Sequence, residues 1–256
     1  MSWHTVNSFD LTGKVAIVTG SNTGLGAGMA VALAEAGCDI VGVSRADAGA
    51  TAARVKAAGR RFADVRADLS SIAPVDDIVR AALEAFGRID VLVNNAGIIR
   101  RDDALEFGED DWDAVMDVNL KSLFFLSQAA ARQFVRQGDG GKIINVASML
   151  SFQGGIRVAS YTASKSGVLG LTRLLANEWA AQRINVNAIA PGYMATANTA
   201  ALRDDAQRNG EILGRIPAGR WGEPGDLAGP VVFLASSASD YVHGHTLAVD
   251  GGWLAR

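Results

Sequence analysis

Short apolar stretches alternate along the chain with longer segments of mixed polarity. Most of the apolar stretches are rich in β-branched residues and bounded by glycine or polar residues, a pattern that predicts buried strands. The predicted strands are KVAIVT (14–19), DIVGVS (39–44), FADVRA (62–67), IDVLVNNAG (89–97, running into a loop), KIINVAS (142–148), INVNAIAPG (184–192) and a last short one, TLAVDGG (246–252).

The longer segments predict helices over 25–37, 74–86, 110–136 and 160–181. Gly37 ends the first of these as a C′ residue, and Pro74 lies near the first turn of the second.

Strands that are apolar throughout and alternate with helices are typical of a parallel sheet covered on both faces. Right-handed crossovers then give a doubly wound, Rossmann-type α/β fold. We predict a single dinucleotide-binding domain over 1–256 with about seven parallel strands and helices on both faces. It includes a substrate lid at about 193–221, where TANTAALRDDAQRNG looks like a helix-and-loop flap.

The composition narrows the function classes. The 256 residues are 49% hydrophobic and carry a net charge of -3, which argues against nucleic acid as a partner. No apolar run is long enough to span a membrane, and MSWHTVNSFDLTGK at the start lacks the layout of a signal peptide. Cys38 is the only cysteine, and the three histidines have no metal-ligand spacing. We therefore expect a cytoplasmic protein without a disulfide or a metal site.

A glycine-rich stretch, TGSNTGLG (19–26), follows the first predicted strand. Gly20, Gly24 and Gly26 permit tight backbone geometry and close approach of a pyrophosphate to a helix N-terminus. The spacing is G-x-x-x-G-x-G rather than the commoner G-x-G-x-x-G, and a plain glycine turn is the alternative. We predict a dinucleotide site here, with Asn22 and Leu25 in the same loop.

Ser44 and Arg45 follow the second predicted strand. In such folds an acidic residue here binds the ribose hydroxyls of NAD, whereas a nearby arginine accommodates the 2′-phosphate of NADP. The residues therefore favour NADP or the use of both cofactors, and the alternative is that Arg45 is a solvated surface charge.

Small and polar residues follow the other strands as well. Each alone is usually only part of a turn, but their joint placement after successive strands indicates one site. The further predicted cofactor contacts are Asp68, Leu69, Asn95, Ala96, Gly97, Pro191, Gly192, Met194 and Thr196.

The stretch SYTASKSG (160–167) places Tyr161 and Lys165 one helical turn apart. An ordinary surface pair is one interpretation. The other is chemical, because a nearby positive charge lowers the tyrosine pKa from about 10 towards the range in which a general acid or base works best.

With these motifs the sequence resembles the short-chain dehydrogenase/reductase family over essentially its whole length. The matching motifs are T-G-x-x-x-G-x-G at 19–26, N-N-A-G at 94–97, Asn119, Ser148, Y-x-x-x-K at 161–165 and P-G at 191–192. The resemblance implies that Tyr161 is the general acid/base and that Ser148 hydrogen-bonds the reacting oxygen. It also implies that Lys165 holds the nicotinamide ribose and lowers the pKa of Tyr161, and that Asn119 holds a water of a proton relay.

Longer stretches look like family members that oxidise or reduce a deoxy-keto sugar acid of the 2-dehydro-3-deoxy-D-gluconate type in pectin or alginate breakdown. These stretches lie at 100–107, 140–167, 187–199, 215–227 and 250–256. This resemblance implies an oxidoreductase that uses NAD, with NADP as the alternative, and a homotetramer. Alternatives with the same mechanism are a gluconate 5-dehydrogenase, an unsaturated-uronate reductase and a 3-oxoacyl carrier-protein reductase. A catalytically silent dinucleotide-binding sensor is the non-enzyme alternative.

An anionic substrate favours an arginine in the site. Arg100 follows the N-N-A-G loop and Arg157 lies between Ser148 and Tyr161, and each is alternatively a surface charge or a subunit salt bridge. The carrier-protein reductase alternative requires a basic patch that binds an acidic carrier protein. The sequence offers only Arg100, Arg101 and Arg157 for such a patch near the predicted site. The other candidates are Met149, Gln153 and Tyr193 in the substrate pocket, Trp221 in the lid and Arg256 at a neighbouring subunit's site.

Overall fold

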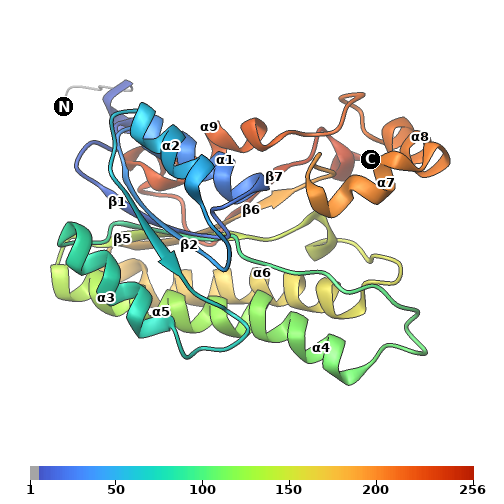
Figure 1. The fold of residues 1–256 in the computed structure, drawn as a ribbon, viewed down its shortest axis with the longest axis horizontal. Coiled ribbons are helices and arrows are strands. Elements are labelled where there is room, and N and C mark those ends of the chain that lie inside the picture. Colours follow the sequence, from blue (N-terminus) through green and yellow to red (C-terminus); the bar gives the residue numbers. More distant parts are fainter. Residues whose placement is uncertain (1–5) are drawn as a thin grey trace.

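Seven parallel strands form one sheet in the order β3-β2-β1-β4-β5-β6-β7 in the computed structural model, which describes residues 6–256 (Figure 1). The strands are β1 (Val15–Thr19), β2 (Asp39–Ser44), β3 (Phe62–Arg66), β4 (Val91–Asn94), β5 (Gly141–Val146), β6 (Ile184–Pro191) and β7 (Thr246–Val249). This confirms the predicted doubly wound α/β fold. Residues 1–5, part of the stretch in which no signal-peptide layout was found, lie outside the described residues.

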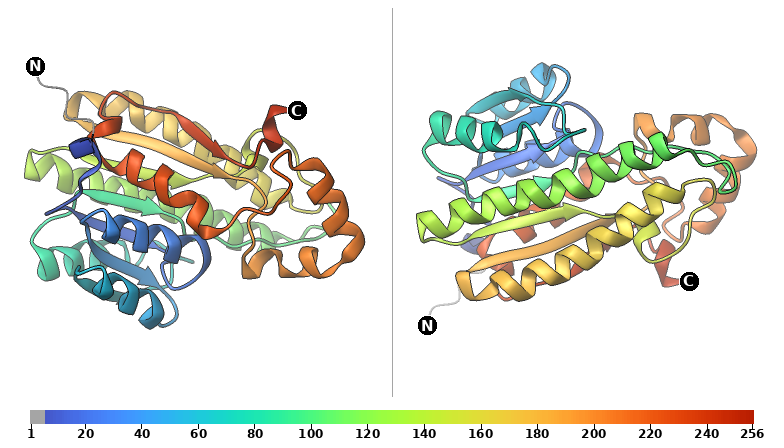
Figure 2. Two further views of the ribbon diagram at one scale, coloured as in Figure 1. Left: turned by 90° about the horizontal axis from the view of Figure 1, so that it is seen from above. Right: turned by 90° about the horizontal axis from the view of Figure 1, so that it is seen from below.

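Helices cover both faces of the sheet, with α1, α2 and α9 on one side and α3, α5 and α6 on the other (Figures 1 and 2). The helices are α1 (Gly24–Glu35), α2 (Gly49–Ala57), α3 (Val75–Phe86), α4 (Glu109–Met116), α5 (Ser122–Gln137), α6 (Ala159–Trp179), α7 (Ala200–Asp204), α8 (Ala206–Arg215) and α9 (Ala228–Ala235). The sequence patterns did not predict α2 and α9.

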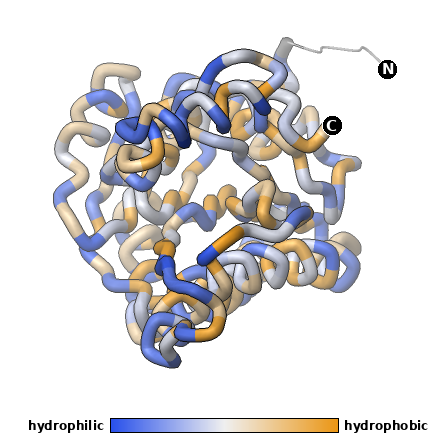
Figure 3. The backbone as a smooth tube through the Cα atoms, turned by 90° about the vertical axis from the view of Figure 1, so that its right-hand side faces the viewer, coloured by the Kyte–Doolittle hydropathy of each residue, from blue (hydrophilic) through white to orange (hydrophobic). Residues whose placement is uncertain are grey.

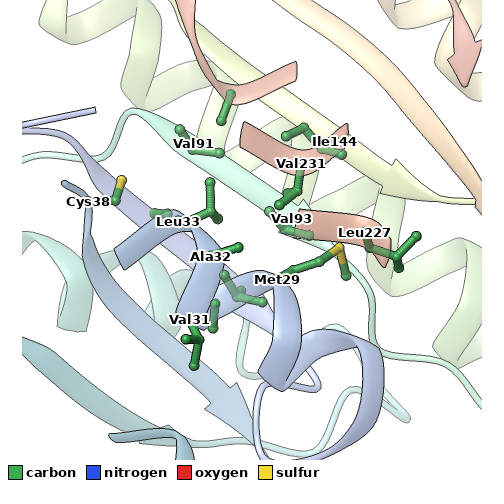
Figure 4. Close-up of a cluster of buried hydrophobic side chains, with 14 of the residues drawn as sticks. Met29, Val31, Ala32, Leu33, Cys38, Val91, Val93, Ile144, Leu227 and Val231 are labelled. Atoms are coloured by element: carbon green, nitrogen blue, oxygen red, sulfur yellow. The ribbon is translucent and has the colours of Figure 1, made fainter. Parts of the chain in front are cut away.

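The strand residues alternate between the two helical layers, because successive side chains of a strand point to opposite faces. Along β1, Val15 and Ile17 pack in the cluster with α3 and α5, whereas Ala16 and Val18 pack in the cluster with α1 and α9. Figure 4 shows the second cluster, where Met29 of α1 lies near Val93 of β4 and Leu227. Side chains on both faces are buried under helices, which explains why the central strands are mostly apolar. In Figure 3 hydrophobic backbone segments lie near the middle of the molecule.

The segment predicted as one long helix over 110–136 is interrupted. A π-helical turn, Asp117–Lys121, separates α4 from α5 and carries the fully buried Asn119. Single π-helical turns inside α-helices occur often at functional sites. The interruption therefore marks the part of this helix that faces the site.

The carboxyl ends of all seven strands meet at one edge, because the strands are parallel. Helices α7 and α8 lie beyond this edge, beside the C-terminus (Figures 1 and 2). Within residues 6–256, no helix combines the length and the apolar content needed to cross a bilayer. The same residues contain no group of three or more His, Cys, Asp or Glu side chains able to hold a metal ion.

Candidate active site

Three elements bring the four predicted catalytic residues to the carboxyl edge of the sheet. Ser148 follows β5, Tyr161 and Lys165 lie on α6, and Asn119 lies on the π-helical turn. Ser164 of α6 joins two of these elements, because its hydroxyl accepts a hydrogen bond from the Asn119 amide at 3.2 Å.

Lys165 is buried, with 4% of its surface exposed. Its Nζ donates a hydrogen bond of 2.6 Å to the carbonyl oxygen of Val146 and lies 5.7 Å from the centre of the Tyr161 ring. Burial disfavours the ammonium form and lowers the pKa of Lys165 to about 8. Among residues 6–256, the partner of this ammonium is thus a backbone carbonyl rather than a carboxylate.

The expectation that Lys165 lowers the pKa of Tyr161 is wrong for this arrangement. Burial raises the pKa of the Tyr161 phenol, and the Ser148 hydroxyl and the positive charge of Arg101 oppose that rise without reversing it. Lys165 is not among the groups that shift the Tyr161 pKa, and its Nζ is hydrogen-bonded to the Val146 carbonyl. In this state Tyr161 is a proton donor at neutral pH.

Ser151 was missed in the sequence analysis and links the catalytic residues to one another. Ser148 caps the short helical turn Met149–Ser151, and its Oγ accepts a hydrogen bond from the backbone of Leu150 at 3.2 Å. The Ser151 hydroxyl accepts a bond from the Ser148 N–H and donates one of 2.7 Å to the Lys165 carbonyl. The Ser-x-x-Ser spacing of a capping box was the signal for this role.

The side chain of Asn119 is fully engaged with protein groups. Its Oδ1 accepts a hydrogen bond from the Ile98 N–H at 2.8 Å, and its Nδ2 donates one of 2.9 Å to the Ile98 carbonyl. Asn119 therefore fixes the backbone that follows the N-N-A-G loop. The water relay implied by the family resemblance stays a prediction.

The glycine-rich loop packs tightly against the N-N-A-G loop. A Cβ on Gly26 would lie 2.1 Å from the Gly20 carbonyl oxygen, and Gly20 itself has a φ of +66°. The Asn95 amide donates to the Thr19 carbonyl at 2.9 Å, while the Thr19 hydroxyl accepts from the backbone N–H groups of Asn95 and Ala96. Thr19, the first residue of the motif T-G-x-x-x-G-x-G, thus joins the two loops, a role that the sequence analysis did not assign to it.

This cradle fits a dinucleotide. The N-cap of α1, Thr23, makes no side-chain capping bond, so the first N–H groups of the helix are free to bind a pyrophosphate. Across from them, Thr196 lies near Gly24, with its Cγ2 3.7 Å from where a Cβ on Gly24 would be. The remaining predicted contacts line the same edge at the ends of β1, β4 and β6: Asn22, Leu25, Gly97, Pro191, Gly192 and Met194.

At the end of β2, the Ser44 hydroxyl is used internally, since it donates to the Ala46 carbonyl at 2.8 Å. Arg45 is exposed, and its side chain has no hydrogen bond or ion pair with the part of the chain that the structure describes. Asp68 accepts a bond from the Ser70 N–H at 2.9 Å, and Leu69 is buried. The position that carries an acid in NAD-specific sites is therefore without one.

Arg100 and Arg157, predicted to meet a substrate carboxylate, are both held by carboxylates of the chain. The Arg100 Nε lies 3.0 Å from Asp111, and the Arg157 Nε lies 3.3 Å from Asp103. Both guanidiniums are thus in exposed ion pairs in the ligand-free chain, and their contact with a substrate stays a prediction.

The other substrate candidates belong to an aromatic cluster between the predicted lid and the C-terminus. The Tyr193 ring packs against Trp221 and Trp253, with centroid distances of 5.4 and 4.8 Å. Met149 is buried in this cluster, next to Ile212 of α8.

Two arginines tie the same cluster together. The Arg215 guanidinium stacks on Trp253 at 4.1 Å and lies 3.5 Å from the Gln153 amide oxygen. Arg256 donates to the Gly214 carbonyl of its own chain at 2.9 Å. The C-terminus thus packs on α8 within one subunit, and the approach of Arg256 to a neighbouring subunit's site stays a prediction.

Comparisons with known proteins agree with this geometry. A family model described as enoyl-(acyl carrier protein) reductase matches residues 20–254. The 2-dehydro-3-deoxy-D-gluconate 5-dehydrogenase of Escherichia coli K12 is 67% identical over 251 residues, covering 98% of this chain and 99% of that protein.

Two solved structures share the fold and carry a cofactor. One, from Agrobacterium tumefaciens and assigned as a 2-deoxy-D-gluconate 3-dehydrogenase with bound NADP, is 57% identical, with a TM-score of 0.93 over 98% of this chain and 100% of that one. The other, a gluconate 5-dehydrogenase from Burkholderia cenocepacia with NADP and tartrate, is 41% identical, with a TM-score of 0.94 over 99% and 100%.

Proposed function

Because the chain belongs to the short-chain dehydrogenase/reductase family of NAD(P)-dependent oxidoreductases, we propose that it oxidises the carbon-5 hydroxyl of 2-dehydro-3-deoxy-D-gluconate and, in reverse, reduces the resulting ketone. The observation that carries this proposal is the 67% sequence identity to the E. coli enzyme of that name, which extends over nearly the full length of both proteins. The arrangement of Ser148, Tyr161 and Lys165 supports it independently, since these groups suit proton transfer at a carbinol oxygen.

The roles of the chain's residues follow from their chemistry. The nicotinamide, when bound, accepts or supplies the hydride. During reduction the Tyr161 phenol gives its proton to the ketone oxygen. During oxidation the phenol first loses its proton to solvent, and the phenolate then takes the proton of the substrate hydroxyl. In both directions Ser148 donates a hydrogen bond that holds this oxygen. Lys165, whose ammonium has a carbonyl as its hydrogen-bond partner among residues 6–256, binds the ribose hydroxyls of the cofactor.

We further infer that NADP serves at least as well as NAD. No acid ends β2, and Arg45 is exposed and free to pair with a 2′-phosphate. Bound NADP in the two solved relatives supports this inference. The NAD preference implied by resemblance to sugar-acid dehydrogenases is the alternative.

The test is the absorbance of reduced nicotinamide, followed with purified protein, 2-dehydro-3-deoxy-D-gluconate and either NAD or NADP. Reduction of either cofactor at a kcat/KM above about 10⁴ M⁻¹s⁻¹ supports the proposed substrate. D-gluconate is the matched comparison, because the Burkholderia relative is a gluconate 5-dehydrogenase. A higher kcat/KM for gluconate assigns the chain to that alternative, and no turnover of the deoxy-keto acid overturns the proposal.

We also propose a cytoplasmic homotetramer that acts in pectin breakdown. Large apolar side chains exposed on α4 and α5 support assembly, with Trp112 40% and Val135 54% exposed. Light scattering during size-exclusion chromatography measures the mass in solution, and a monomer contradicts this part of the proposal.

A further inference from the structure

Three arginines lie on two loops that are hydrogen-bonded to each other next to the catalytic residues, and only Arg101 lacks an ion pair with residues 6–256. Arg100 and Arg157 are engaged by Asp111 and Asp103. Arg101 is exposed, and its side chain has neither an ion pair nor a hydrogen bond with any residue in 6–256. An unpaired guanidinium on a loop beside the catalytic residues is well suited to bind a substrate carboxylate.

The backbone that carries Arg101 is fixed on both sides. On one side, Ile98 exchanges two hydrogen bonds with the buried side chain of Asn119. On the other, the Asp102 N–H donates to the Arg157 carbonyl at 3.1 Å. The stem of the Arg101 side chain therefore starts from a position set by Asn119 of the catalytic set and by the Arg157 backbone.

The link to Arg157 uses an unusual backbone conformation. Arg157 has a φ of +63°, in the left-handed region that non-glycine residues rarely adopt. Such residues persist only where the surrounding structure determines them, and they cluster at functional sites. Here the conformation presents the Arg157 carbonyl to the Asp102 N–H, four residues before Tyr161.

Arg101 is also close enough to the catalytic centre to act on it. It is the one charged side chain whose field lowers the pKa of Tyr161. The proposed substrate carries its carboxylate at carbon 1 and its reacting hydroxyl at carbon 5, so a short carbon chain must connect this cation with the phenol.

We propose that Arg101 binds the carboxylate of the substrate and makes the enzyme select acids over neutral polyols. The inference rests on the proposed function and deepens it by naming the residue that recognises the substrate class. Arg100 and Arg157 then act as supports: their charges are neutralised within the protein, and the Arg157 backbone holds the loop.

The experiment compares Arg101→Met with Arg100→Met and Arg157→Met, using 2-dehydro-3-deoxy-D-gluconate and its uncharged methyl ester as substrates. Removing one partner of a charge-assisted bidentate contact costs about 100-fold. We expect Arg101→Met to lose about that factor in kcat/KM on the acid, mostly through KM, and less than about threefold on the ester. Arg101→Lys restores part of the loss, and Arg100→Met stays within about threefold of the wild type.

Equal losses on acid and ester, or a larger loss on the acid in Arg100→Met than in Arg101→Met, overturn the inference. The failure of the proposed function looks different, because the wild-type protein itself then leaves the acid unchanged. In that case calorimetric titration of D-gluconate and tartrate into the protein saturated with NADP provides the test. Weaker binding by about tenfold or more in Arg101→Met supports the inference, and unchanged binding overturns it.

Discussion

The Lys165 Nζ donates a 2.6 Å hydrogen bond to the carbonyl oxygen of Val146, the last residue of β5. This bond ties α6 to the central sheet from a side chain that is almost wholly buried. A buried ammonium with a neutral partner is costly to hold, since one unit of pKa shift corresponds to about 1.4 kcal/mol. The buried Lys165 ammonium therefore lowers the free energy of unfolding of the ligand-free protein.

Replacing Lys165 by Met should stabilise the ligand-free protein at pH 7 by about 2 kcal/mol while abolishing turnover. The pKa of Lys165 is lowered in the folded state to about 8 from 10.5, so the wild type carries the full penalty below pH 8 and loses it as the pH rises towards 10.5. The advantage of the variant should shrink by more than half between pH 7 and about pH 9.5.

Urea unfolding of both proteins at the two pH values measures this difference. The exposed Lys56→Met is the control and should change the free energy of unfolding by less than about 0.5 kcal/mol at either pH. A Lys165→Met protein that is less stable than the wild type at pH 7 contradicts the account.

Tyr161→Phe should reduce kcat by about 10³-fold or more, because the ring keeps its packing and loses only the proton-carrying hydroxyl. The dissociation constant of NADP, measured by fluorescence titration, should stay within about twofold, since Lys165 and the glycine-rich loop are untouched. The fully exposed Tyr241→Phe is the matched control and should retain full activity. Retained turnover in Tyr161→Phe would remove the phenol from the mechanism.

The central strands and their parallel order were predictable because a strand buried on both faces has a continuous apolar sequence, which can be recognised without knowing its neighbours. Every residue of β1, β2, β4 and β6 is buried, and so their sequences are apolar runs. The π-helical turn has no comparable sequence pattern, since it depends on the hydrogen bond between Asn119 and Ile98, which lie 21 positions apart. Helix α9 is apolar with little helical periodicity, and a periodic pattern search passes over it.

The residue types of the site were predictable from spacing, but their electrostatics were not. Tyr161 and Lys165 are one turn apart in any helix. The direction in which the Tyr161 pKa shifts depends instead on how deeply the phenol is buried in the folded protein. Whether each arginine has an ion-pair partner likewise depends on the tertiary structure. Arg100 and Arg157 are paired with Asp111 and Asp103, and only the fold brings those carboxylates to them.

Ser44→Asp should shift the ratio of kcat/KM for NAD over NADP by about 30-fold towards NAD. A carboxylate at the end of β2 accepts hydrogen bonds from the ribose hydroxyls and repels a 2′-phosphate. Ser44→Asn is the uncharged control and should shift the ratio by less than about threefold. An equal shift in both variants would mean that size rather than charge is read at this position.

Gly26→Ala should disrupt the cofactor cradle. A methyl group there would lie 2.1 Å from the Gly20 carbonyl oxygen and 2.5 Å from the Asn95 amide, so the loops must separate. We expect a loss of about 2 kcal/mol in the free energy of unfolding and at least tenfold weaker NADP binding. Gly170→Ala, inside α6 with no atom within 4 Å of where its Cβ would lie, should instead be neutral or slightly stabilising. Unchanged NADP binding in Gly26→Ala would show that this close contact is dispensable.

Arg215→Ala tests whether the C-terminus and α8 support the catalytic loop. Arg215 joins three segments, since its guanidinium stacks on Trp253 at 4.1 Å and lies 3.5 Å from the Gln153 amide oxygen, five residues after Ser148. A cation–π contact of this kind contributes about 1 kcal/mol, so its loss should loosen α8 without unfolding the domain. We expect kcat/KM for the sugar acid to fall by about fivefold to tenfold, mainly through KM, with the thermal midpoint lowered by less than about 3 °C.

The control variant Arg208→Ala changes a residue on the same helix and removes only an exposed ion pair with Glu211. Its kcat/KM should therefore remain within about twofold of the wild type. Identical kinetics in the two variants would mean that Arg215 stabilises α8 no more than any other surface charge and that Trp253 packs there without consequence for the site.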